Sequence, residues 1–272
     1  MISDNKLMEA DLMSDYQIPK VWEWKEENPD LSGNRPTAGP RFDQDLPVGD
    51  APLQVYSLGT PNGKKITIIL EELKELGKDI DYDLYKIDIT KGDQFGSDFV
   101  KLNPNSKIPA MVDQSLDPSL KLFESGSILQ YLANKYGHFL PEEIHEKTET
   151  LNWLYWQIGA APYVGGGFGH FFAHISEAME YPIDRFTKET KRQLDLLDKV
   201  LADRPYIAGD QYTIADIAIW PWYGELVLGN LYKRSDEFLN VTEYTNLRKW
   251  AQNIADRPGV KKGLAADYQS IN

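Results

Sequence analysis

The sequence has no cysteine among its 272 residues. This absence excludes a disulfide framework, a CxxC redox centre, a nucleophilic protein thiolate and metal sites built on cysteine. Any thiol chemistry that the protein carries out must therefore use a thiol that it binds.

Positive charge is also scarce, with 29 Lys and Arg residues against 42 Asp and Glu and a net charge of -13. That balance repels phosphate backbones and anionic lipid, so we expect no nucleic acid and no membrane as partner. No apolar run reaches the roughly 18 residues that a membrane span needs. The first residues, MISDNKLMEAD, lack the basic and apolar regions of a signal peptide, and we expect a cytoplasmic protein.

The length predicts roughly two domains, and 42% hydrophobic residues are enough for their cores. Residues 1–52 stand apart, because they hold six of the sixteen prolines and eleven acidic residues against five basic ones. We interpret them as an extended N-terminal arm, with residues 1 to about 19 a candidate for disorder. Its expected anchoring points are residues 21–24 and 34–36, since the two tryptophans of the first stretch favour packing onto a body.

Residues 53–138 carry the pattern of an α/β domain. Residues 53–57 alternate as in a half-buried strand, and apolar residues at helical spacing follow over 66–76. A second alternating strand over 82–89 makes this helix a right-handed crossover between two parallel strands.

Two short apolar runs follow, over residues 110–112 and 120–123, and the turn formers between them predict two antiparallel edge strands. Ser125 stands where a helix would start, with a hydroxyl that can cap its first turn. The predicted order is βαβ-ββα, which is the thioredoxin-like order.

A linker is expected in residues 137–149, and an all-α domain over residues 146–265. Helices are predicted over residues 148–158, 183–201 and, as the last one of the chain, 247–254. Thr213 and Asp216 have the spacing of a capping box, so a further helix should start at Thr213 and form the centre of the second domain.

Three positions point to binding before any family is considered. Glu124 and Ser125 come where a strand meets a helix N-terminus, which favours a carboxylate. A cis bond between Ile108 and Pro109 would turn the Ile108 backbone groups outward, free to pair with an extended peptide. Thr60 and Asn62 lie between a strand and a helix, either as a capped turn with positive φ at Asn62-Gly63 or as neutral donors for a thiolate.

The strings NPNSKIP and FESGSILQYL, in residues 103–133, resemble the glutathione-binding half of cytosolic glutathione transferases. SLGTPNGKK, from Ser57 to Lys65, resembles their nu-class, or YghU/YfcG-like, branch, which lacks the usual catalytic tyrosine, serine or cysteine. The resemblance spans residues 22–263 and implies a thioredoxin-like α/β N-terminal domain, an all-α C-terminal domain, glutathione as co-substrate and a homodimer.

The resemblance also implies roles for individual residues. Thr60 and Asn62 would be catalytic, as donors to the glutathione sulfur. The implied glutathione-binding residues are Asn34, Gln94, Lys107, Ile108, Glu124, Ser125 and Arg185. Of these, Arg185 and Asn34 would serve a second glutathione, while Lys107 would meet the glycyl carboxylate or be an ordinary surface charge. Gln157 departs from the pattern, because its amide comes one residue earlier than in some relatives.

Two further patterns predict no chemistry. The run Gly165 to Gly169 lacks the GK[ST] ending and the preceding strand of a phosphate-binding loop, and indicates a helix break or a close interdomain approach. His170 and His174 share a helix face, but no HExxH glutamate accompanies them and no metal is predicted.

The predicted activity is glutathione-dependent reduction of small or glutathione-linked disulfides by a bound glutathione thiolate. Two alternatives stay open: S-transfer of glutathione to electrophiles, and a non-catalytic member of the fold that binds ligands or partner proteins.

Overall fold

The computed structural model describes residues 17–25 and 33–271, and the chain divides after Thr37 into two units. The described residues of the first unit contain no helix or strand, and the Arg35 guanidinium carbon lies 5.7 Å from the Trp24 ring centroid. Residues 1–16 of the segment predicted as a candidate for disorder lie outside the described residues. Packing of the arm's tryptophans onto the body stays a prediction.

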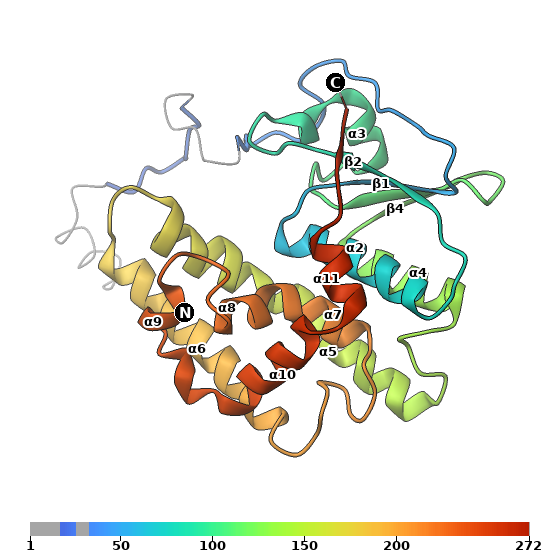
Figure 1. The fold of residues 1–272 in the computed structure, drawn as a ribbon. Coiled ribbons are helices and arrows are strands. Elements are labelled where there is room, and N and C mark those ends of the chain that lie inside the picture. Colours follow the sequence, from blue (N-terminus) through green and yellow to red (C-terminus); the bar gives the residue numbers. More distant parts are fainter. Residues whose placement is uncertain (1–16, 26–32, 272) are drawn as a thin grey trace. The chain divides into compact units, whose positions relative to one another are not determined.

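The second unit begins with the predicted thioredoxin-like order (Figure 1). Its elements are β1 (Leu53–Ser57), α2 (Pro61–Glu75), β2 (Tyr82–Lys86), the 3-10 turn η1 (Asp93–Phe95), α3 (Ser97–Leu102), β3 (Ala110–Asp113), β4 (Leu120–Phe123) and α4 (Ser125–Tyr136). β1 pairs in parallel with β2, as predicted, and antiparallel with β3. A C-terminal strand, β5 (Gln269–Ser270), adds to β2, so the sheet has the order β4-β3-β1-β2-β5. The sequence pattern predicted neither α3 nor β5.

Two predictions about these strands are wrong. β3 is not an edge strand, because it lies between β4 and β1. β1 is not half-buried, since all five of its residues are buried. Leu53 and Val55 pack with α2 and α4 on one face, while Tyr56 packs with α3 on the other, so the strand is covered on both sides.

The rest of the second unit is helical. It contains α5 (Ile144–Pro162), the π-helical η2 (Tyr163–His174), α6 (Glu180–Val200), α7 (Ile214–Ile219), the π-helical η3 (Trp220–Gly224), α8 (Glu225–Val227), α9 (Ser235–Phe238), the 3-10 turn η4 (Val241–Glu243), α10 (Thr245–Ala255) and α11 (Pro258–Leu264). The predicted capping box at Thr213 is present, and the buried Asp216 carboxylate also accepts the Trp250 indole N–H at 2.9 Å. α7 is buried along its whole length, as predicted for the centre of this part.

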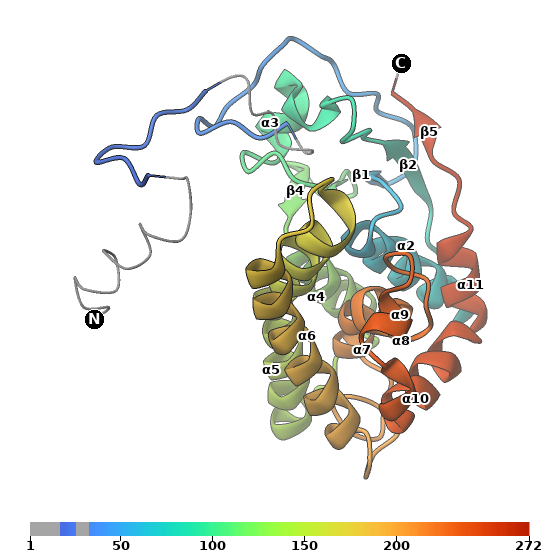
Figure 2. The same cartoon turned by 90° about the vertical axis from the view of Figure 1, so that its left-hand side faces the viewer.

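The prediction that the last helix covers residues 247–254 is wrong, because Pro258 starts α11. Figure 2 shows α11 lying beside α2. Gly259 and Gly263 allow that approach, since a Cβ at either would come 2.7 Å from an α2 backbone atom. The Arg257 guanidinium then forms two hydrogen bonds of 2.7 Å with the Glu72 carboxylate.

The glycine run in η2 serves close packing, but not between the two predicted domains. A Cβ at Gly165 would come 2.6 Å from the Trp222 ring, and one at Gly167 would come 2.3 Å from the Phe186 ring. The approach is not interdomain, because both rings belong to the helical part. The predicted domain limits at residues 52, 138 and 146 stay predictions.

Candidate functional site

The register of the sheet gathers several predicted residues at one end. Tyr56 of β1 lies opposite Ala110 of β3, and Ala110 lies opposite Phe123 of β4. Three segments therefore meet at the same end of the strands. They contain Thr60, the Ile108–Pro109 bond and Glu124. The Ile108–Pro109 bond is cis, as the sequence suggested. Because β2 runs parallel to β1, the turn after β2 also lies at this end.

The start of α2 is built around Thr60 and Gly63. Thr60 is the N-cap residue, and its hydroxyl accepts the Gly63 N–H at 3.4 Å. A Cβ on Gly63 would come 1.8 Å from the Leu58 carbonyl oxygen, so only glycine fits there. Asn62 and Gly63 are both helical, so the alternative that they form a turn with positive φ is wrong, whereas the capping role of Thr60 is confirmed.

Asn62 has a partner that sequence reasoning missed. The indole N–H of Trp222, in η3, donates to Asn62 Oδ1 at 2.9 Å. Next to it, the Lys64 ammonium donates to both Glu225 carboxylate oxygens, at 2.6 and 2.9 Å. Three hydrogen bonds therefore hold the first turns of α2 against the η3 and α8 segment. The apolar run around Trp222 predicted burial and gave no signal for this contact.

The start of α4 differs from the prediction in one detail. Glu124, and not Ser125, is the N-cap residue, and it makes no side-chain capping bond. Its backbone has φ 67° and ψ 119°, an uncommon conformation for a residue with a side chain. Ser125 is the first residue of the helix itself, and its hydroxyl accepts a bond from the Lys65 ammonium at 3.2 Å. The turn leaves Glu124 exposed and Ser125 buried at the helix start.

Lys65 is the second residue that sequence reasoning missed. It is fully buried, and its ammonium also donates to Gln157 Oε1 of α5 at 2.6 Å. Burial lowers the pKa of the Lys65 ammonium to about 7, against the opposing effect of the Glu124 charge. The signal was its spacing of four residues from the buried Ile69 on α2. Gln157, whose contact the sequence put in doubt, therefore points into the core toward Lys65.

The other predicted residues are more scattered. Gln94 is buried in η1, where its amide donates to the Ile89 carbonyl at 3.4 Å, and Lys107 is exposed just before Ile108. Arg185 is exposed on α6, far from the sheet end in the sequence. Asn34 belongs to the first unit, so its approach to the other residues stays a prediction.

Tyr56 and Ser57 are the other hydroxyl groups close to Thr60 in the sequence. The Tyr56 hydroxyl donates to the Pro47 carbonyl at 2.7 Å, and burial raises its pKa above the ordinary value. The Ser57 hydroxyl is buried beside Gly63. Neither group is therefore presented at the helix start as Thr60 and Asn62 are.

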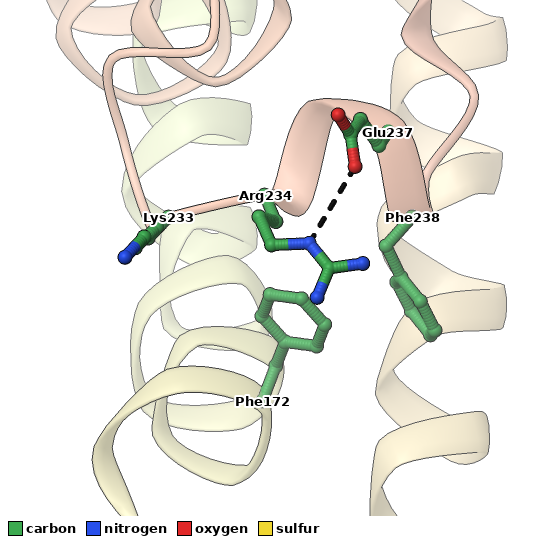
Figure 3. A pocket seen from close by; sticks show the side chains of 5 residues that line it. All are labelled: Phe172, Lys233, Arg234, Glu237 and Phe238. Carbon is green, nitrogen blue, oxygen red and sulfur yellow. Dashed lines mark ion pairs between the residues drawn. The ribbon is translucent and has the colours of Figure 1, made fainter.

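A cavity of about 450 Å³ lies elsewhere, in the helical part (Figure 3). It is lined by Phe172, Lys233, Arg234, Glu237 and Phe238. Figure 3 shows the Arg234 and Glu237 side chains paired across its rim, at 3.5 Å. None of the residues predicted to bind glutathione lines this cavity, so its volume does not locate the site.

Two features are absent from residues 17–25 and 33–271. No group of three or more His, Asp or Glu side chains could hold a metal ion, and His174 instead lies edge-on to the Tyr232 ring. No helix in this part of the chain is both long and apolar enough to cross a membrane.

Comparison with known proteins places the chain in a family. Residues 51–134 match the family model "Glutathione S-transferase, N-terminal domain" and residues 180–253 match "Glutathione S-transferase, C-terminal domain". The chain is 53% identical to the disulfide-bond oxidoreductase YghU of Escherichia coli, over 91% of this chain and 87% of that protein.

Two solved structures are also similar. One is glutathione transferase YghU from Streptococcus pneumoniae, complexed with glutathione, with 62% identity, a TM-score of 0.93 and coverage of 94% of this chain and 100% of that one. The other is a glutathione transferase from Pseudomonas putida with one glutathione disulfide bound per subunit, with 38% identity, a TM-score of 0.70 and coverage of 78% and 90%. With both family models matched and these relatives aligned over most of its length, the chain belongs to the glutathione S-transferase family.

Proposed function

We propose that the protein reduces small or glutathione-linked disulfides with the thiolate of bound glutathione. The observation that carries this proposal is the start of α2, where Thr60 and Asn62 stand as neutral hydrogen-bonding groups in a chain that has no cysteine. A free thiol has a pKa near 8.5, which a helix N-terminus and added hydrogen bonds lower. Neutral groups there favour the thiolate without trapping it in an ion pair.

The reaction proceeds by two thiol–disulfide exchanges. The bound glutathione thiolate attacks one sulfur of the substrate disulfide, forms a mixed disulfide and releases the other sulfur as a thiolate. A second glutathione thiolate then attacks the glutathione sulfur of the mixed disulfide, which gives glutathione disulfide and releases the second substrate thiol. A small disulfide without glutathione therefore oxidises two glutathione molecules, whereas a glutathione-linked disulfide needs only one exchange and one free glutathione. No bond to the protein forms in either case.

The residues at the sheet end each bind a different part of glutathione. Ile108 pairs with the peptide backbone of glutathione, and Glu124 with Ser125 holds its γ-glutamyl end, where the ammonium meets Glu124 and the carboxylate meets the α4 N-terminus. Lys107 meets the glycyl carboxylate. Gln94, in the turn after β2, makes a further polar contact.

The second glutathione needs a cation, because glutathione carries net negative charge and the protein is acidic. Arg185 supplies that cation, helped by Asn34 from the N-terminal arm. The Pseudomonas putida relative, which has one glutathione disulfide bound per subunit, supports a site large enough for both halves. The Escherichia coli relative's name, disulfide-bond oxidoreductase, supports the choice of reaction.

Two alternatives use the same fold. S-transfer to an electrophile would begin with the same thiolate. A non-catalytic binding protein would need neither Thr60 nor Asn62, and the presence of both at one helix start favours an enzyme. We further propose that the protein works as a homodimer in the cytoplasm, without a metal.

The test measures reduction of a small disulfide with glutathione as the only thiol. We expect turnover, production of glutathione disulfide, and an unmodified protein mass after turnover. A glutathione adduct on the protein that forms and decays at the turnover rate would contradict the mechanism. Stabilisation of the protein by glutathione without any turnover would instead support the non-catalytic alternative.

A further inference from the structure

Trp222 stands out among the residues that the proposed function does not use. It lies in the helical part, at the middle of η3, and yet its indole N–H reaches Asn62 at the start of α2 at 2.9 Å. π-helical turns inside helices are frequent at functional sites. The contact joins the group proposed to face the glutathione sulfur to a part of the chain about 160 residues away.

The chemistry of this bond fixes the orientation of the Asn62 amide. The two ends of an asparagine amide are often hard to tell apart, and the choice depends on their partners. An indole N–H can only donate, so the atom that faces it must be the amide oxygen. The amide nitrogen is then turned away from the indole, and it can only donate.

Neighbouring contacts hold the indole itself in place. Gly165 of η2 packs so closely against the Trp222 ring that a Cβ there would come 2.6 Å from it. On either side of Trp222, the Trp220 indole donates to the Ala251 carbonyl and the Tyr223 hydroxyl donates to Gln193 Oε1, both at 2.8 Å. The bonds of the buried Trp220 and Tyr223 therefore fix η3 in place. Trp222, which is half-buried, projects toward α2.

A second bond keeps α2 and this segment in register. Lys64, two residues after Asn62, pairs with the buried Glu225 at the start of α8. A rotation of the first turn of α2 would break both this pair and the indole bond. Two contacts therefore set the position of the Asn62 amide: its own bond to Trp222 and the pair between Lys64 and Glu225.

From these contacts we propose that Trp222 is a positioning residue, which holds the Asn62 amide so that its nitrogen donates to the sulfur of bound glutathione. This inference rests on the proposed function, since it deepens the role assigned to Asn62. A donor that is already oriented before the charge develops stabilises a thiolate better than one that must first turn. Trp222 touches neither glutathione nor the disulfide in this arrangement, and acts only through Asn62.

The test replaces the indole while keeping an aromatic ring. Trp222→Phe removes the N–H, and we expect it to raise the pKa of the bound glutathione thiol, measured from thiolate absorbance against pH, and to lower kcat about threefold to tenfold. Binding of S-methylglutathione, which has no thiol to ionise, should not change. Trp153→Phe is the matched control, because it removes another indole N–H, one bonded to Glu149 at 2.8 Å, far from α2 in the sequence.

A double-mutant cycle separates this inference from the proposed function. If Trp222 acts through Asn62, Trp222→Phe should have no further effect on the thiol pKa or kcat in an Asn62→Ala background. Full additivity of the two changes would overturn the inference, as would an unchanged thiol pKa in Trp222→Phe when Asn62→Ala raises it. An unchanged pKa and kcat in Asn62→Ala itself would instead overturn the role proposed for Asn62, and this inference with it.

A second variant covers loss of folding. If Trp222→Phe does not fold, Trp222 is replaced by the tryptophan analogue that carries sulfur in place of the ring N–H, which keeps the shape of the indole. A raised thiol pKa in this variant supports the inference, and a pKa equal to that of the unmodified protein overturns it.

Discussion

The starts of α2 and α4 lie at the same end of the sheet, but they are built in opposite ways. Thr60 caps α2 with its own hydroxyl, and the nearby side chains Thr60 and Asn62 are neutral. α4 has no side-chain cap, and the buried Lys65 ammonium lies against its first residue, Ser125. One helix start is capped by a neutral side chain, whereas the other is uncapped and has a buried lysine beneath it.

The difference fits the two kinds of anion in glutathione. A carboxylate benefits from uncapped N–H groups and a nearby cation, because it only has to be held. A thiolate has to be formed and must still attack, and its nucleophilicity falls as its pKa is lowered. The neutral start of α2 therefore suits the sulfur, and the open start of α4 suits the γ-glutamyl carboxylate.

The largest effect is expected from a substitution that disrupts the start of α2, compared with a similar substitution at the start of α4. Gly63→Ala puts a Cβ 1.8 Å from the Leu58 carbonyl oxygen, which is backbone and cannot turn away. We expect it to lower the free energy of unfolding by about 3 kcal/mol, measured by denaturant titration. Gly126→Ala, in α4, meets the flexible side chains of Ile158 at 3.1 Å and Leu154 at 3.8 Å, and should cost less than about 1 kcal/mol.

The matched control is Gly59→Ala, where a Cβ meets nothing within 4 Å. It should leave the free energy of unfolding nearly unchanged. Equal losses in Gly63→Ala and Gly126→Ala would show that the two helix starts are not packed differently.

The next effect removes the neutral groups at the start of α2. Thr60→Ala combined with Asn62→Ala should slow disulfide reduction about 100-fold or more, since two hydrogen bonds to a charged group, each worth about 1.5–3 kcal/mol, are lost together. Binding of glutathione should weaken much less, because these groups matter most when the sulfur is charged. Steady-state kinetics and calorimetry measure the two quantities, and full activity in the double variant would move the chemistry away from α2.

A smaller effect tests the buried Lys65 beneath the start of α4, through the pH dependence of the free energy of unfolding. The pKa of Lys65 is lowered from 10.5 to about 7 in the folded protein. Between these values the unfolded state binds the proton and the folded state does not, so stability rises with pH across this window and is independent of Lys65 titration below it. The free energy of unfolding of the unmodified protein minus that of Lys65→Met should therefore increase by about 1 kcal/mol per pH unit between pH 7 and pH 9.

Lys78→Met controls for the loss of a lysine, because Lys78 is only half-buried, just beyond the end of α2. Its stability difference from the unmodified protein should stay constant over the same range. A constant difference for Lys65→Met as well would mean that Lys65 keeps its proton in the folded protein.

Local patterns predicted the fold well and the site in part. The Leu53–Ser57 and Leu120–Phe123 strands and the helix start at Thr213 were predicted at their observed positions, because alternation and capping are local signals. α3 and α11 were missed, since each is short and begins beside glycine or proline. The fold followed from such signals, and the family from the resemblance of the motifs in residues 57–65 and 103–132.

The two missed residues of the site show why the rest could not be predicted. Lys65 follows another lysine, and composition favours an exposed charge, although its helical spacing put it on the buried face of α2. The apolar run around Trp222 predicted that it lies in the core with Trp220. Trp222 instead lies in a π-helical turn, whose extra residue shifts the helical phase. Its bond to Asn62 joins two distant segments and has no local signature at all.

The smallest expected effect extends the comparison to a second anion site, outside both helix starts. Arg185 is exposed on α6, and glutathione disulfide brings negative charge to an acidic protein, so a single cation there should matter for the second half of the ligand. Arg185→Ala should weaken binding of glutathione disulfide about tenfold, the value of one charged hydrogen bond, while binding of one glutathione changes less than about twofold. Removal of residues 1–34 should act in the same direction.

Lys199→Ala is the control, because Lys199 is a cation of the same helix that pairs with Asp195 at 2.6 Å and lies roughly 21 Å further along it. Calorimetric titration with each ligand measures these constants. Unchanged affinity for glutathione disulfide in both the Arg185 and the truncated variants would confine glutathione to the pocket of Ile108, Glu124 and Ser125, and the two helix starts would then account for the whole site.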